Sequence, residues 1–228
     1  MGKQALVTTG ATATFVGLIE CALAVPFLEA LVDLGYSKLV VQYGRSAQHI
    51  NTVKNLCEQV TQCGSDGNIS GKSLRARGRK PAHMEVEDTE DRGCVIRTKF
   101  AGQLAIECLQ YDASLTEHYT QESALVISHA GTGSIMDVLR LSSRGSNIQL
   151  VVMVNEKLQD NHQGEIADAF AGLGVLQSVR CSVEELVSAV SATSADPADT
   201  TSSAIRRSQL APAQGAVVRR VVLEELNM

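Results

Sequence analysis

The chain has 228 residues, of which 44% are hydrophobic, and a formal net charge of −5 at pH 7. This length accommodates one globular domain with a sizeable core, or one such domain with a tail. The sequence lacks the basic stripe of a nucleic-acid-binding protein, and no run approaches the roughly 18 apolar residues of a membrane span. Its six cysteines form no CxxC pair and show no zinc-ligand spacing, so we expect a reducing compartment and no metal centre.

The first 60 residues alternate between short apolar strands and helices with apolar periodicity. The expected elements are a strand at 4–7, a turn of small residues at 8–13, a helix from 14 to 34, a strand at 38–42 and a helix at 50–60. Pro26 predicts a break or kink in the first helix, because proline lacks the backbone N–H that a helix interior needs. Gly35 is well suited to end that helix.

Apolar periodicity disappears over residues 61–95, where Gly, Ser, Arg and acidic residues dominate. We interpret this stretch as a long surface insertion with the composition that disordered segments share. Strands and helices alternate again after it. The expected elements are strands at 104–109, 124–128, 149–154 and 175–176, and helices at 114–119, from 134, at 161–173 and at 183–190.

The clearest strands are apolar along their whole length, which is typical of a parallel sheet covered on both faces. The sequence therefore predicts a doubly wound, Rossmann-like α/β domain over residues 1–190, with its ligand at the carboxyl ends of the strands. A Ser, Thr, Ala and Asp-rich linker at 191–212 and an amphipathic helix at 213–228 follow. The apolar stripe of that helix must be buried, either on its own domain or on a partner.

A buried strand runs into a glycine-bearing loop and then into a helix over residues 125–137. Such a junction exposes free backbone N–H groups at the positive end of a helix, which is a favourable site for phosphate. His129 stands at the exit of the strand as a cation-capable donor, and Asp137 lies one turn into the helix. A diphosphate with a ribose attached would meet both side chains.

Two further loops should reach the same edge of the sheet, at residues 8–13 and 158–163. The second of these is rich in Asp, Asn, His and Gln at the start of a helix, and such groups can pair with the hydroxyls of a sugar. Helix starts also favour Asp and Asn for capping alone, so the spacing leaves both interpretations open.

These motifs resemble those of a known family. Residues 125–137 (LVISHAGTGSIMD), 160–163 (DNHQ) and 6–15 (LVTTGATATF) are similar to the nucleotide-sugar-binding half of GT-B glycosyltransferases. Within that group the chain resembles the catalytic subunit of the two-protein UDP-N-acetylglucosamine transferase of the dolichol pathway. The resemblance implies inverting transfer of GlcNAc from UDP-GlcNAc to GlcNAc-diphosphodolichol, without a bound metal or other cofactor.

The resemblance also implies roles for individual residues. Asp137 matches the acidic residue that binds the ribose, and His129 would donate to phosphate and stabilise the leaving UDP. The other matches are Gly131, Gly133 and Ser134 for the diphosphate, Asp160, His162 and Gln163 for the GlcNAc, and Thr9 and Gly10 for the phosphates or the acceptor side. A general base must deprotonate the acceptor hydroxyl, and His129, Asp160 and a partner subunit are all candidates.

A GT-B enzyme is built from two Rossmann-like domains, whereas 228 residues accommodate one. The resemblance thus implies a heterodimer with a membrane-anchored, acceptor-binding subunit that recruits this cytoplasmic chain to the cytosolic face of the endoplasmic reticulum. One rival hypothesis is a non-enzymatic nucleotide-binding or regulatory subunit with the same fold. Another is a nicotinamide-dependent oxidoreductase, but residues 10–13 lack the GxGxxG turn that it requires.

Overall fold

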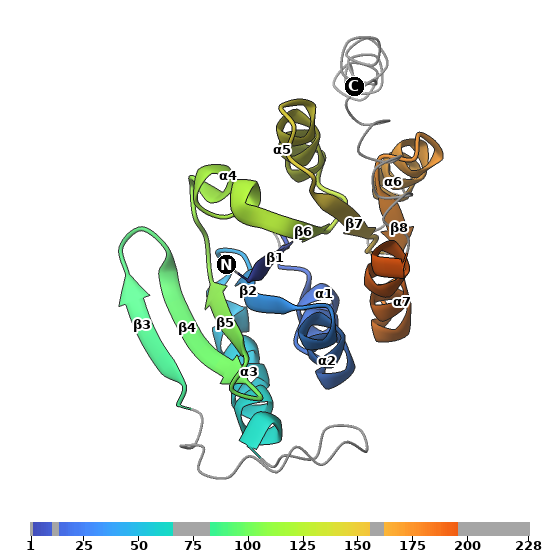
Figure 1. The fold of residues 1–228 in the computed structure, drawn as a ribbon. Coiled ribbons are helices and arrows are strands. Elements are labelled where there is room, and N and C mark those ends of the chain that lie inside the picture. Colours follow the sequence, from blue (N-terminus) through green and yellow to red (C-terminus); the bar gives the residue numbers. More distant parts are fainter. Residues whose placement is uncertain (1, 11–13, 66–82, 156–161, 196–228) are drawn as a thin grey trace.

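The structure, a computed structural model, describes residues 2–10, 14–65, 83–155 and 162–195 as a sheet with helices on both faces (Figure 1). The strands are β1 (Lys3–Thr8), β2 (Tyr36–Gln42), β3 (Glu85–Thr89), β4 (Gly93–Phe100), β5 (Leu104–Leu109), β6 (Ser123–Ser128), β7 (Gln149–Met153) and β8 (Gln177–Val179). The helices are α1 (Val16–Ala22), α2 (Val25–Asp33), α3 (Ile50–Ser65), α4 (Leu115–His118), α5 (Thr132–Ser143), α6 (His162–Gly172) and α7 (Val183–Ala195), with 3-10 turns at Ala47–His49 and Thr120–Glu122.

The strand order β3-β4-β5-β2-β1-β6-β7-β8 confirms the predicted doubly wound α/β fold. In the part of this order that runs β5-β2-β1-β6-β7-β8, every pair of neighbouring strands is parallel. β1 pairs with β2 on one side and with β6 on the other, so the direction of winding reverses between β1 and β6. Ligands of such sheets bind beyond the carboxyl ends of the strands at this reversal.

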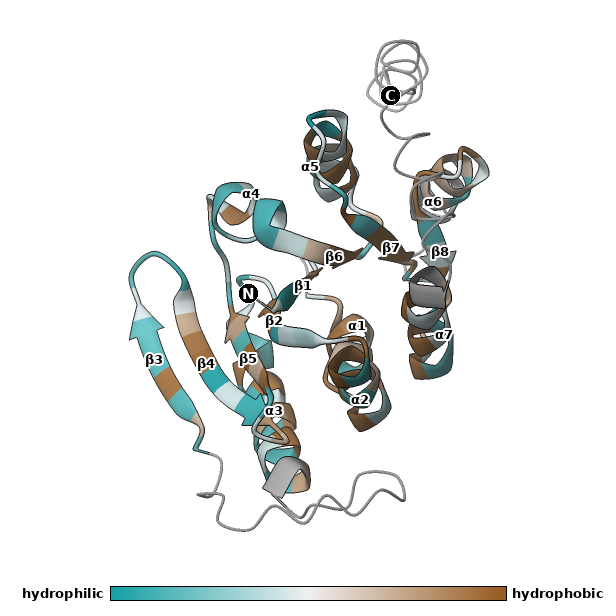
Figure 2. Cartoon of the chain, viewed as in Figure 1, coloured by the Kyte–Doolittle hydropathy of each residue, from teal (hydrophilic) through white to brown (hydrophobic). Residues whose placement is uncertain are grey.

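Alternate residues of the central strands contribute to two hydrophobic cores, one on each face of the sheet. In β1, Ala5 and Val7 pack into the core beneath α1, α2, α3 and α7, whereas Leu6 packs into the core beneath α5 and α6. Hydrophobic colours accordingly dominate β6 and β7 in Figure 2. Because both faces are buried, the strands need apolar residues at every position, which explains their continuously hydrophobic sequences.

Pro26 begins a helix rather than interrupting one. α1 ends at Ala22, and Pro26 lies in the first turn of α2, where the missing N–H of proline would have no helical acceptor in any case. Gly35 ends α2 as predicted, with a φ of +79° and its N–H donating to the carbonyl of Val32. The predicted single helix is therefore two helices joined at residues 23–24.

The prediction of a surface insertion over residues 61–95 is wrong for both ends of that stretch. α3 continues to Ser65, and β3 and β4 form an antiparallel hairpin that extends the sheet beyond β5. β3 lies at the edge of the sheet with exposed acidic side chains, and it is mainly hydrophilic in Figure 2. Edge strands often carry charge that discourages pairing with other chains, and this removes the alternation by which strands are recognised. Residues 66–82 lie outside the described residues.

Two boundaries near the carboxyl end also differ from the prediction. β8 begins at Gln177, immediately after the apolar pair expected to form it, and α7 continues to Ala195. The first five residues of the predicted 191–212 linker are therefore helical. The rest of that linker and the predicted helix at 213–228 lie outside the described residues.

Candidate functional site

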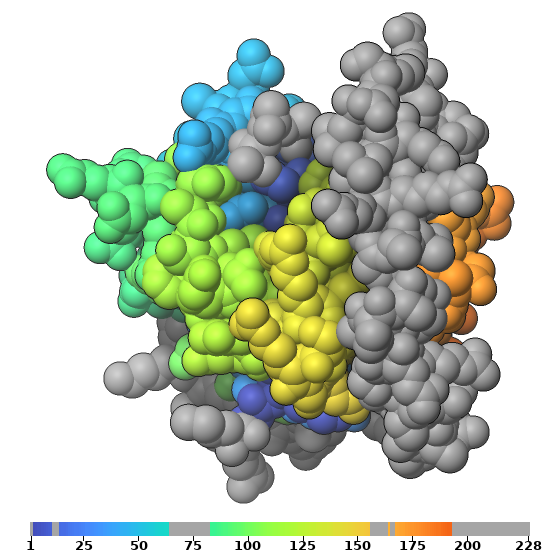
Figure 3. Space-filling view, turned by 90° about the horizontal axis from the view of Figure 1, so that it is seen from above, coloured from blue at the N-terminus to red at the C-terminus, as the bar shows by residue number. Residues whose placement is uncertain are grey.

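A cavity of about 230 Å³ opens at the point where the winding of the sheet reverses. Its lining residues come from β1 and the loop after it, from β6, from the end of β2, from the segment after β5, from α4 and the 3-10 turn that follows it, and from α5. They are Leu6, Thr8, Gly10, Gln42, Tyr111, Asp112, Ala113, Leu115, Thr116, Thr120, Val126, Gly133, Ser134 and Asp137. In the space-filling view, atoms of the N-terminal segment lie at the bottom of a hollow between α4 and α5 (Figure 3). The cavity thus lies where the fold is expected to hold a ligand.

The N-terminus of α5 forms one wall of this cavity. Gly131 is the N-cap residue, it provides no side-chain cap, and the first turn contains no acidic residue. The first N–H groups of the helix therefore have no side-chain acceptor from these positions, and the helix dipole adds positive charge there. The residue before the cap, Ala130, has a φ of +66°, a strained conformation for a non-glycine residue and one often found at functional sites.

His129 is held between two glycines. A Cβ atom placed on Gly10 or on Gly131 would lie 2.6 Å from Cε1 of the imidazole, so only glycine leaves room for the ring at both positions. Gly10 also has a φ of +80°, which disfavours other residues independently. The two glycines therefore determine where the imidazole lies.

The environment of His129 favours its neutral form. Burial lowers the pKa of His129 below its usual range, and a backbone hydrogen bond with Thr8 partly offsets that fall. The buried Nδ1 atom has no hydrogen-bond partner among the described residues. The sequence predicts a cation-capable donor at this position, whereas burial of the ring in the structure favours its uncharged form.

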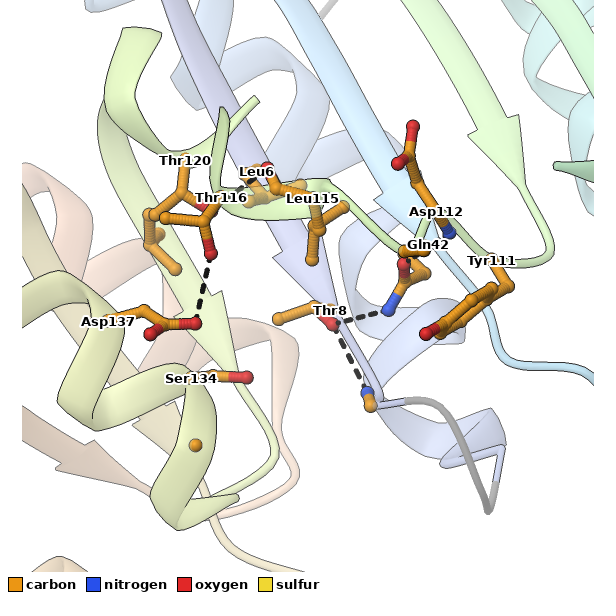
Figure 4. Close-up of a pocket in the computed structure, with 14 residues that line it drawn as sticks. Leu6, Thr8, Gln42, Tyr111, Asp112, Leu115, Thr116, Thr120, Ser134 and Asp137 are labelled. Carbon is orange, nitrogen blue, oxygen red and sulfur yellow. Dashed lines mark hydrogen bonds between the residues drawn. The ribbon is translucent and has the colours of Figure 1, made fainter. Parts of the chain in front are cut away.

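A chain of hydrogen bonds connects the ends of β1, β2 and β5. The hydroxyl of Thr8 accepts from Nε2 of Gln42 at 3.1 Å and from the backbone N–H of Gly10 at 3.2 Å (Figure 4). Oε1 of Gln42 accepts from the backbone N–H of Asp112 at 3.0 Å. Because the Thr8 hydroxyl accepts both bonds and donates to no described residue, its proton is available to a ligand in the cavity.

The carboxylate of Asp112 is already engaged away from the cavity. It accepts from the backbone N–H of Ser114 at 2.8 Å, from His118 at 2.9 Å and from Arg92 at 3.4 Å. Asp112 therefore orders the segment that leads into α4, and its own side chain has little capacity left for a ligand.

Asp137 lies in the second turn of α5 and faces α4 across the cavity. Its Oδ2 atom accepts from the hydroxyl of Thr116 at 2.9 Å (Figure 4). Its Oδ1 atom lies 3.5 Å from the guanidinium of Arg140. On another wall, the ring of Tyr111 has the guanidinium of Arg45 3.8 Å from its centre. The cavity thus combines hydroxyl groups, a carboxylate, an aromatic ring and the positive end of a helix.

Two findings concern other kinds of site. Within the described ranges, no three His, Cys, Asp or Glu side chains gather closely enough to hold a metal ion. The helices of the same ranges are all too short or too polar to cross a membrane.

Comparison with known proteins identifies the family. The family model "Glycosyltransferase family 28 C-terminal domain" matches residues 76–217. The UDP-N-acetylglucosamine transferase subunit ALG13 of Eremothecium gossypii is 35% identical over 82% of this chain and 80% of its own length. The chain belongs to the ALG13 family.

Two further ALG13 proteins are also similar to this chain. The chain is 35% identical to the Candida albicans ALG13 subunit over 75% of its own length, and it spans about half (54%) of that longer relative. An ALG13 structure determined by NMR in solution has 30% sequence identity and a TM-score of 0.57, with 85% of this chain and 86% of the other covered. The resemblance deduced from the HAGTGS and DNHQ motifs is thereby confirmed.

The structure brings together most of the residues that the ALG13-like motifs predicted for the site. Gly10, Gly133, Ser134 and Asp137 line the cavity. His129 lies beside Gly10, with its ring packed against both Gly10 and Gly131. These residues come from two distant parts of the sequence, so their convergence supports the predicted phosphate-binding junction.

Four predicted residues are not brought into the cavity by the described structure. Thr9 is fully buried, and its hydroxyl donates to the backbone carbonyl of Gln42 at 3.4 Å. Asp160 lies outside the described residues. His162 and Gln163 begin α6, but the placement of their side chains is also outside the described part.

Sequence reasoning missed several lining residues of this ALG13-family site. They are Thr8, Gln42, Tyr111, Asp112 and Thr116. Thr8 and Gln42 are the last residues of apolar strands, and Tyr111 and Asp112 follow closely after another. A polar residue at the carboxyl end of an apolar strand is thus a signal that could have identified four of the five.

Proposed function

We propose that the cavity binds UDP-GlcNAc and that the chain is the donor-binding catalytic subunit of a GlcNAc transferase. The observation that carries this proposal is the N-terminus of α5, which opens into the same cavity as Asp137 and lies against His129. The printed names of the relatives, UDP-N-acetylglucosamine transferase subunits, support the same donor.

The donor would lie with its diphosphate against the start of α5. The backbone N–H groups of Gly133 and Ser134, together with the Ser134 hydroxyl, can bind phosphate oxygens there. Asp137, one turn further along, can accept hydrogen bonds from the ribose hydroxyls. The sugar would extend towards Gly10 and towards residues 158–163, which include Asp160, His162 and Gln163.

In the proposed reaction, a hydroxyl oxygen of the acceptor attacks the anomeric carbon from the face opposite to UDP. The bond between that carbon and the phosphate oxygen breaks, UDP leaves with the electron pair, and the configuration changes from α to β. The positive end of α5 stabilises the negative charge on the leaving diphosphate, and the protonated form of His129, which burial disfavours, would add a hydrogen bond to it. The acceptor proton passes to a general base, for which His129, Asp160 and a partner subunit remain the candidates.

The proposed acceptor is GlcNAc-diphosphodolichol, presented by a membrane-anchored subunit at the cytosolic face of the endoplasmic reticulum. The relatives are named as subunits, which supports a partner for this chain as well. The predicted helix at 213–228 is the candidate segment for docking on that partner.

Titration calorimetry of the full 228-residue chain with UDP-GlcNAc tests the donor site. Replacing Asp137 with Ala removes a charged acceptor for the ribose, and hydrogen bonds to charged groups are worth about 1.5–3 kcal/mol. We therefore expect the Kd to rise about 10- to 100-fold. The matched control is Asp88→Ala, because Asp88 is an exposed carboxylate on the edge strand β3.

The control variant should bind the donor as the wild-type chain does. Absence of heat from UDP-GlcNAc with the wild-type chain would refute the proposed donor. An unchanged affinity in Asp137→Ala would refute the role given to Asp137.

A further inference from the structure

A single hydrogen bond connects the two helical walls of the cavity. The hydroxyl of Thr116 in α4 lies 2.9 Å from Oδ2 of Asp137 in α5, and both residues line the cavity. Figure 4 shows the two side chains pointing towards each other across the opening. These residues are 21 positions apart, so the contact depends on the tertiary fold and not on the geometry of one helix.

The second contact of Asp137 holds it less firmly. Arg140 lies one turn along the same helix, 3.5 Å from Oδ1, and 69% of its side chain is exposed. Ion pairs at exposed positions are screened by water and contribute little to holding a geometry. The Asp137 side chain is itself 39% exposed, so without Thr116 it would be free to turn towards Arg140 and the solvent.

We propose that Thr116 is a positioning residue, which holds the carboxylate of Asp137 in the orientation that receives the ribose hydroxyls of the nucleotide. This inference rests on the proposed function, because it concerns the same donor site. An ionised carboxylate can accept about four hydrogen bonds. Thr116 therefore fixes the carboxylate while leaving capacity for two hydroxyl groups.

If the Asp137 carboxylate is already held in place, its side chain loses less conformational entropy when the nucleotide binds. A side chain ordered before the ligand arrives loses less freedom on association, and this improves affinity without a new contact to the ligand. Thr116 would consequently influence binding only of ligands that use Asp137. That selectivity distinguishes a positioning residue from one with a merely structural role.

Measuring the affinity of the full chain for UDP by titration calorimetry tests the proposal. Thr116→Val keeps the shape of the side chain and removes the donor, so the Kd for UDP should rise about three- to tenfold. Thr116→Ser keeps the hydroxyl and should restore affinity to within about twofold of the wild type. The comparison ligand is 2′,3′-dideoxy-UDP, which lacks both ribose hydroxyls and should bind Thr116→Val and the wild type equally.

A third variant checks that the effect passes through Asp137. In an Asp137→Ala background, the additional change Thr116→Val should alter the Kd for UDP by less than twofold. Because Thr116 is only partly buried, water can replace its hydroxyl and the variant should remain folded, which its thermal unfolding midpoint will show. If Thr116→Val nevertheless failed to fold, Thr116→Ala with the same two ligands would take its place.

Three outcomes would overturn the inference. They are an unchanged UDP affinity in the folded Thr116 variant, an equal loss for UDP and its dideoxy analogue, and a full effect of the variant in the Asp137→Ala background. Failure of the wild-type chain to bind UDP at all would instead refute the proposed function itself.

Discussion

The position of His129 depends on the absence of side chains at two neighbouring residues. Gly10 and Gly131 leave room for the imidazole, and burial lowers the pKa of the ring. From the sequence, Gly131 is predicted to bind the diphosphate, and Gly10 is predicted to lie near the phosphates or the acceptor side. That they also confine His129 becomes evident only when the loops after β1 and β6 are seen side by side.

Replacing Gly131 with Ala separates this steric role from effects on the backbone. The N-cap φ of −70° suits alanine, but the new Cβ would lie 2.6 Å from Cε1 of His129, so the ring must move. We expect the pKa of His129 to rise towards its usual value of about 6.5 as the ring becomes hydrated. An NMR titration of the histidine Cε1–H signals measures this change, and the affinity for UDP-GlcNAc should fall with it.

The matched control is Gly172→Ala. Gly172 is the last residue of α6, it has no positive φ, and a Cβ there would meet no atom within 4 Å. The pKa of His129 should not change in this variant. If it also stayed unchanged in Gly131→Ala, the proposed confinement of the ring would be wrong.

Among the elements, the parallel strands could be predicted from the sequence and the β3–β4 hairpin could not. β1, β6 and β7 are buried on both faces, so their apolar runs are distinctive. β3 is an exposed edge strand, and its sequence, EVEDT, resembles a solvated loop. The role of Thr116 could not be predicted from the sequence either, because its contact with Asp137 joins two different helices and depends on the tertiary fold.

Tyr43 adds a hydrogen bond between the end of β2 and the hairpin, which is joined to the sheet by the pairing of β4 with β5. This tyrosine follows β2, it is fully buried, and its hydroxyl donates to the carbonyl of Cys94 in β4 at 2.7 Å. Tyr43→Phe would leave that carbonyl without this donor in a place that water does not reach. We expect the free energy of unfolding to fall by about 1–3 kcal/mol, as measured by urea denaturation.

Tyr36→Phe provides the comparison for this change in stability. Tyr36 begins β2, and its hydroxyl makes no hydrogen bond to any described residue, so the loss of that hydroxyl should cost less than about 0.5 kcal/mol. Equal stability losses in the two variants would show that the bond between Tyr43 and Cys94 has no special importance for the hairpin.

At the scale of the whole molecule, the described residues form one α/β sheet with one candidate donor site. Inverting transfer needs an acceptor hydroxyl within about 3–3.5 Å of the anomeric carbon and in line with the leaving group. The proposed membrane-anchored subunit would bring the acceptor to that position. We therefore expect the full chain alone to bind UDP-GlcNAc without transferring it, and the assembled pair to transfer it.

Transfer of radiolabelled GlcNAc to a lipid-diphosphate-GlcNAc acceptor measures this dependence directly. Asp137→Ala should still co-purify with the partner but should lose transfer at low donor concentration, because its defect concerns donor binding and not assembly. Transfer by the chain alone would show that the partner is not required for the chemistry. An assembled pair that binds UDP-GlcNAc but transfers nothing would favour the rival hypothesis of a regulatory nucleotide-binding subunit, since fold and donor binding are common to both hypotheses.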